Sequence, residues 1–104
     1  MIVEYIRYSV PTARHDDFVA AYRDASAALD ASPHCLGYEL SRCHEEPTSY
    51  VLRIEWDSLS GHLQGFRTSS DFQRFFSKVR PFFEQIQEMR HYEVSEVVAK
   101  KSRA

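Results

Sequence analysis

Glycine is scarce in this chain, and asparagine is absent. Among 104 residues there are only three glycines, Gly37, Gly61 and Gly65, and their spacing is not that of a loop that cradles a dinucleotide or a phosphate. We therefore expect no flavin, nicotinamide or other bound cofactor.

Cysteine is also rare, and the two cysteines are poorly spaced for joint chemistry. If Cys35 and Cys43 lie on one extended strand, eight steps of about 3.3 Å place them about 26 Å apart. Neither a disulfide nor a shared metal ion can span that distance. The neighbouring histidines, His34 and His44, do not change this conclusion, and we expect no metal site.

Long apolar runs and a strong excess of one charge are missing as well. No segment approaches the roughly 20 apolar residues of a membrane span, and the start of the chain lacks the basic, then apolar pattern of a signal peptide. The formal net charge of -2 argues against nucleic-acid binding. We expect a cytoplasmic protein with no membrane or nucleic-acid partner, and we interpret the basic residues of 99–104 as a solvated tail.

The alternation of apolar residues predicts one α+β domain over residues 1–98. Strands are expected at 2–10, 35–43, 49–56 and 89–98. Thr12 is the expected N-cap of a helix that ends before Ser32-Pro33, and Ser69 or Ser70 that of a second helix, which Pro81 kinks. A short helical piece is expected around His62. The order βαββαβ indicates a ferredoxin-like fold, an antiparallel sheet with both helices on one face.

The sheet face away from the helices is predicted to be polar. It would present Tyr5, Arg7, Arg53 and Glu55, with either Glu39 or His91 and Glu93 added according to the strand register. Such a face can be solvated, as in many antiparallel sheets. Alternatively, two copies can enclose a pocket between their sheets. Because a chain this short buries a limited share of its surface, a homodimer is the expected assembly.

The second half of the chain resembles the antibiotic biosynthesis monooxygenase family. The matching segments, together with the strand at 2–10, are Glu55-Trp56-Asp57-Ser58, His62-Leu63, Gly65-Phe66-Arg67, Phe72, Phe75-Phe76, Val79-Arg80-Pro81-Phe82 and Glu88-Met89-Arg90-His91-Tyr92-Glu93. The resemblance implies ferredoxin-like protomers that pair into a dimeric α/β barrel. Haem-degrading relatives use an asparagine, a tryptophan and a histidine, so a chain without asparagine does not match that branch.

The resemblance implies a monooxygenase that oxidises a small phenol, quinol or anthrone-like substrate with O2 and without a cofactor. Such a reaction needs a base, a donor for the developing oxyanion and a dry aromatic wall. The alternative is a non-catalytic dimeric barrel that binds a small ligand or serves as an accessory protein, since this superfamily hosts several unrelated functions.

Six residues are expected at the site on this basis. His62 is the expected base and Trp56 a substrate wall, although either could be structural. Arg67 could stabilise an anionic intermediate or pair with Asp71. Tyr5, Arg53 and His91 are expected on the barrel face, as substrate contacts or dimer contacts. The phenylalanines are assigned to the core because their spacing is that of a buried helix face: Phe72, Phe75, Phe76, Phe82 and Phe83.

Overall fold

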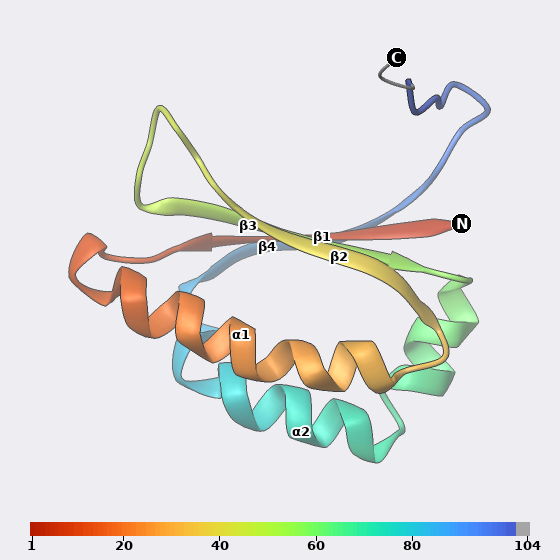
Figure 1. The fold of residues 1–104 in the computed structure, drawn as a ribbon, viewed down its shortest axis with the longest axis horizontal. Helices are drawn as coiled ribbons and strands as arrows, with labels where there is room; N and C mark the ends of the chain where they lie inside the picture. The colour runs from red at the N-terminus through yellow and green to blue at the C-terminus, as the bar shows by residue number, and fades with distance from the viewer. Residues whose placement is uncertain (102–104) are drawn as a thin grey trace.

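The computed structural model describes residues 1–101 and has two layers (Figure 1). Four antiparallel strands form one sheet in the order β2-β3-β1-β4. Helices α1 and α2 lie on the same face of this sheet. The strands are β1 (Ile2–Ser9), β2 (Cys35–Arg42), β3 (Ser49–Trp56) and β4 (Ile86–Glu93), and the helices are α1 (His15–Ala31) and α2 (Ser70–Val79). The predicted ferredoxin-like α+β fold is confirmed.

Three short helical segments connect these elements and adjust the predicted boundaries. They are η1 (Thr12–Arg14) and η3 (Arg80–Gln85), both 3-10 helices, and η2 (Gly61–Phe66), a π-helix. Ser69 caps α2 by accepting a hydrogen bond from the N–H of Phe72, as expected. The expectation for Thr12 was wrong. It lies inside η1, and α1 begins after Arg14 without a side-chain cap.

The two edge strands depart from their predicted bounds. β4 begins at Ile86 rather than at residue 89, because the register with β1 shifts between Arg7 and Tyr8 and allows Tyr8 to pair with Ile86. It ends at Glu93 rather than at residue 98, because β1 begins at Ile2, which is the partner of Glu93. β2 likewise ends at Arg42, one residue early. Of the expected tail 99–104, residues 102–104 lie outside the described residues.

The core fills the space between the sheet and the two helices. Phe18 contacts Tyr8, Tyr22, Tyr50 and Phe82 with ring centroids 4.9–5.3 Å apart, mostly in edge-to-face arrangements. Such aromatic pairs add to the stabilisation from apolar burial. Among residues 1–101 no helix is long and apolar enough to cross a membrane.

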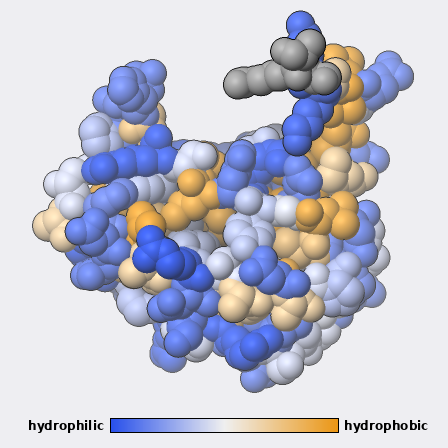
Figure 2. All heavy atoms as spheres, viewed as in Figure 1, coloured by the Kyte–Doolittle hydropathy of each residue, from blue (hydrophilic) through white to orange (hydrophobic). Residues whose placement is uncertain are grey.

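The opposite face of the sheet has no helix over it, and we call it the open face. Tyr5 and Arg53 are cross-strand partners there, and the Nε of Arg53 donates to the hydroxyl of Tyr5 over 3.3 Å. Arg53 also pairs with Glu55 over 2.6 Å. The segment after β4 rises on this side (Figure 1), and Figure 2 shows hydrophobic surface near the two chain ends. The exposed valines of the segment after β4 are Val97 and Val98.

Candidate functional site

A carboxylate lies on the helix side of β1, among apolar residues. Glu4 is only 2% exposed, and it follows the same alternation as Ile6 and Tyr8. The indole Nε1 of Trp56, at the end of β3, donates to its Oε1 over 3.2 Å. A guanidinium nitrogen of Arg67 is 4.0 Å from its Oε2. A buried charge needs such partners, and these two fix the orientation of the carboxylate.

The π-helix η2 brings one more polar side chain, that of His62, to this carboxylate. The N–H of Arg67 donates to the carbonyl of His62 over 3.0 Å, a bond that spans five residues rather than four. His62 is 3% exposed and stacks on the Trp56 ring, with centroids 4.3 Å apart and planes 10° apart. Its Nε2 lies 3.5 Å from Oε1 of Glu4. Single π turns often occur at functional sites.

His91 completes a cluster of three ionisable groups, which we call the Glu–His–His cluster (Glu4, His62 and His91). Its register position on β4 is directly opposite Glu4. The Nε2 of His91 is 2.7 Å from Nδ1 of His62 and 3.8 Å from Oε2 of Glu4. With Glu4 ionised, each polar atom has a suitable partner in one arrangement of protons. The Nε2–H of His91 donates to Nδ1 of His62, and the Nε2–H of His62 faces the Glu4 carboxylate. The cluster is then a chain of donors that ends at Glu4.

Burial shifts the acid–base behaviour of the cluster. Loss of hydration raises the pKa of Glu4 to about 6, although the Trp56 hydrogen bond and the Arg67 charge oppose this effect. Burial, with the Arg67 and His91 charges, lowers the pKa of His62 to about 3. Burial, with Arg67, also lowers the pKa of His91. The carboxylate therefore titrates closer to neutrality, while His62 stays uncharged.

A cavity of about 250 Å³ opens beside Glu4 and His62, between β1, β3, β4 and α2. We call it the site cavity. Its wall is mainly aromatic and aliphatic, and Glu4, His62 and Arg67 are its charged or titratable side chains apart from Tyr8. Phe72, Phe76 and Phe83 line it without being fully buried, and Phe83 is 51% exposed. The assignment of all five phenylalanines to the core was therefore wrong for Phe83, while Phe72 packs against the core and is partly buried.

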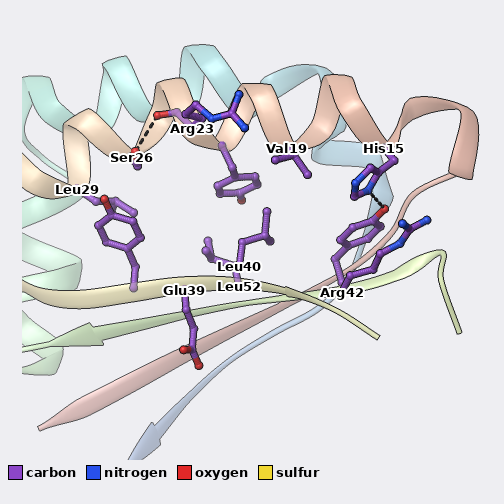
Figure 3. Close-up of a pocket in the computed structure, with 12 residues that line it drawn as sticks. His15, Val19, Arg23, Ser26, Leu29, Glu39, Leu40, Arg42 and Leu52 are labelled. Atoms are coloured by element: carbon purple, nitrogen blue, oxygen red, sulfur yellow. Dashed lines mark hydrogen bonds between the residues drawn. The ribbon is translucent and has the colours of Figure 1, made fainter. Parts of the chain in front are cut away.

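A second cavity, of about 460 Å³, lies between α1 and the edge of the sheet formed by β2 and β3 (Figure 3). Val19, Leu29, Leu40 and Leu52 supply much of its apolar wall. Near one end, Nδ1 of His15 and the hydroxyl of Tyr50 are hydrogen-bonded over 2.6 Å. We call it the α1 cavity. It is larger than the site cavity but lacks a buried carboxylate.

The structure brings three of the six predicted site residues together at the site cavity, and a fourth lies just behind it. Trp56, His62 and Arg67 line the cavity, and His91 contacts His62. Arg67 points toward Glu4, while Asp71 pairs with Arg74 instead. The barrel-face placement of His91 was wrong, because its partner in the register is Glu4 rather than a residue of the open face.

The other two predicted residues, Tyr5 and Arg53, lie on the open face, away from the site cavity. Sequence reasoning also missed Glu4. A signal for it existed, since a glutamate at the apolar phase of an alternating strand is unusual unless it has a partner. The partner itself could not be identified, because Trp56 and Glu4 are 52 residues apart in the chain.

The Glu–His–His cluster also contains the side chains that could hold a metal ion. One potential ligand atom from each of the three residues lies within 4.8 Å of the others. The three residues come from β1, η2 and β4, so no local sequence motif predicts this cluster. Both cysteines are free and lie elsewhere.

The fold and site together define a small ferredoxin-like domain with an aromatic pocket under its sheet. A family model for antibiotic biosynthesis monooxygenases matches residues 1–78. The chain belongs to the antibiotic biosynthesis monooxygenase family.

Several relatives share nearly the whole chain. The uncharacterised protein YczJ of Bacillus subtilis is 27% identical over 93 residues, covering 89% of this chain and 98% of YczJ. A candidate antibiotic biosynthesis monooxygenase from Bordetella bronchiseptica is 28% identical, with a TM-score of 0.73 over 90% of this chain and 96% of its own. SnoaB of Streptomyces nogalater, a cofactor-independent oxygenase solved as a mutant, has a TM-score of 0.77 at 14% identity, covering 95% of this chain and 97% of SnoaB. The last similarity concerns the fold alone.

Proposed function

We propose that the protein is a cofactor-independent monooxygenase that oxidises a small phenol, quinol or anthrone-like substrate with O2. The observation that carries the proposal is the buried Glu4 carboxylate, which faces a cavity with aromatic walls. Family membership supports the reaction class. In the reaction, two hydrogen atoms of the substrate leave with one oxygen atom as water, and the other oxygen atom stays on carbon as a carbonyl. The substrate supplies all the electrons.

Glu4 is the proposed proton acceptor, in place of His62. A base works best when its pKa lies near the working pH, and the pKa of Glu4 is raised to about 6 while that of His62 is lowered to about 3. His62 orients the carboxylate through the Nε2 contact of 3.5 Å. The Arg67 guanidinium, 4.0 Å from Glu4, is placed to stabilise the anion that deprotonation creates. Trp56 and Phe72 supply the dry wall.

The test compares O2 uptake and product formation by wild type and Glu4→Gln with a small panel of quinols and anthrones. Glu4→Gln keeps the shape of the side chain and removes its basicity, so turnover should fall by about 10²- to 10⁴-fold. The matched control is Glu55→Gln on the open face, which should keep wild-type turnover. If Glu4→Gln turns over a responsive substrate at the wild-type rate, Glu4 is not the base.

The second candidate function is ligand binding without catalysis, which the α1 cavity favours. Its 460 Å³ and its aliphatic wall can accommodate an apolar molecule, and the cavity has no buried carboxylate to act as a base. Saturable binding of an aromatic probe without O2 uptake from any compound of the panel would favour this function over the oxygenase.

We also propose that two copies pair through the open face, as the family resemblance implies. Tyr5 stands there between Arg53 and Arg90 in the strand register. Light scattering should give about twice the chain mass of 12.2 kDa. Tyr5→Lys would add a third positive charge and should yield monomers, whereas Asp24→Lys on the exposed side of α1 should not. A monomeric wild-type protein would contradict this assembly.

A further inference from the structure

We infer that Glu4, His62 and His91 form a binding site for a divalent first-row transition-metal ion. The inference does not rest on the proposed function, and it departs from the sequence-based expectation of no metal site. That expectation considered neighbouring cysteines and histidines, whereas these three ligands come from three separate elements.

The separations between the polar atoms are near those that one shared ion requires, and small shifts of the side chains would bring them into range. Two ligands at about 2.1 Å from one ion stand about 3.0 to 3.4 Å apart at octahedral or tetrahedral angles. The imidazole nitrogens of His62 and His91 are 2.7 Å apart, and Nε2 of His91 is 3.8 Å from Oε2 of Glu4. The largest separation among the three ligand atoms is up to 4.8 Å, so binding of one ion requires the Glu4 carboxylate to move toward the imidazoles.

The ligands are in the protonation states that metals require. A metal binds neutral imidazole and ionised carboxylate. His62 and His91 share one hydrogen-bonded proton across the 2.7 Å contact, and an ion would take the place of that proton. The charge of Arg67, 4.0 Å from Glu4, opposes a cation, but its side chain is 39% exposed and can turn toward solvent.

The residues around the cluster resemble those of a catalytic metal site more than those of a structural one. The Trp56 Nε1–H orients the Glu4 carboxylate, which is the kind of supporting hydrogen bond that metal ligands receive. Glu4 and His62 also line the site cavity, so one side of the cluster is open to a bound molecule. Two imidazoles and one carboxylate with open positions favour Fe²⁺, Co²⁺ or Zn²⁺ over Mg²⁺ or Ca²⁺.

Trp56 provides a test that needs no substitution. It is the only tryptophan in the chain, and its ring stacks on His62. Adding Co²⁺ to chelator-treated protein should quench its fluorescence saturably, with one ion per protomer by calorimetry and with a visible Co²⁺ absorption band. Unquenched fluorescence at millimolar Co²⁺ would overturn the inference.

Two variants locate the ion. His91→Ala removes a ligand that is partly exposed, so the fold should persist, and the affinity for Co²⁺ should fall at least tenfold. The matched control is a double variant, Cys43→Ser with His44→Ala, at the far end of the β2–β3 hairpin from Trp56; it should bind as wild type does. If the control loses the ion while His91→Ala keeps it, the site is at Cys43 and the inference is wrong.

These measurements also separate the metal site from the proposed reaction. Binding is read from fluorescence and calorimetry, without any substrate. If Co²⁺ binds and chelator-treated protein still turns over its substrate, both inferences stand. If chelated protein is inactive and Fe²⁺ restores activity, the cofactor-independent part of the proposed function fails while the metal site remains.

Discussion

Each face of the sheet carries a glutamate, and the two glutamates lie in opposite environments. Glu4 is buried on the helix side, whereas Glu55, on the neighbouring strand, has a side chain 30% exposed on the open face. Glu55 pairs directly with Arg53, which is exposed to a similar degree. Glu4 instead has a longer contact to Arg67, an indole N–H and two imidazoles.

The difference shows that burial, more than residue type, creates a reactive group here. In the single chain, water reaches Glu55 and its partner, so their mutual attraction is largely screened there. Around Glu4 the missing water raises the pKa to about 6. A polar sheet face therefore does not by itself locate the functional site. The site lies instead on the apolar face, where a polar side chain, Glu4, stands among apolar ones.

The largest effect is expected from Trp56, which is fully buried beneath the cluster. Trp56→Ala removes the stack on His62, the hydrogen bond to Glu4 and a large part of the core. Substitutions of this kind destabilise proteins by about 3–5 kcal/mol. Urea unfolding should show this loss, while the exposed aromatic Tyr92→Ala should lose far less. Comparable losses would contradict the contrast between the two faces.

A smaller effect is expected from the titration of Glu4 in chelator-treated protein. Its pKa is about 6 in the folded state and 4.5 when the side chain is fully hydrated, so the folded state holds more protons between these values. The Glu4 contribution to stability is therefore present below pH 4.5 and is lost as the pH rises through 6. The difference between these two pKa values corresponds to a loss of about 2 kcal/mol.

His62 acts in the opposite direction across this whole window, because folding lowers its pKa from 6.5 to about 3. The Glu4 effect must therefore be read as the difference between the unfolding curves of wild type and Glu4→Gln at each pH. Glu55→Gln serves as the control substitution on the open face. Parallel curves for Glu4→Gln would show that Glu4 is hydrated in the folded protein.

The smallest effect is expected from the ion pair between Arg53 and Glu55. Arg53→Ala should lower the free energy of unfolding by less than about 1 kcal/mol, and added salt should reduce even that, because both groups are partly exposed. The measurement is a urea titration at a fixed protein concentration. A loss well above 2 kcal/mol would mean that this face is as dry as the helix side.

The fold was largely predictable because its strands alternate cleanly. β3 was predicted residue for residue, since Tyr50, Leu52, Ile54 and Trp56 alternate without interruption between two turn segments. The start of β4 was missed because Phe82, Phe83 and Ile86 continue the apolar spacing of the preceding helix. Only the pairing of Tyr8 with Ile86 reveals that the chain is already extended there.

The site was predictable only in part because it depends on register. Trp56, His62 and Arg67 were identified through the family resemblance, and they lie close in sequence, at the end of β3, on η2 and directly after η2. His91 faces the helices because it pairs with Glu4, and a slip of one residue would have turned it to the open face. Contacts between segments this distant cannot be read from local patterns.

The position of β1 in the sheet has a consequence for how the pocket opens. β1 is an inner strand, hydrogen-bonded on both sides, so the amide of Glu4 should exchange with deuterium only when the whole domain unfolds. η2, which carries His62, has a single turn of backbone bonds and should exchange through local opening at much lower free energy. Deuterium uptake by η2 would then measure the local opening through which a substrate enters the site cavity. The Glu4 carboxylate, which this opening exposes, would stay fixed on β1.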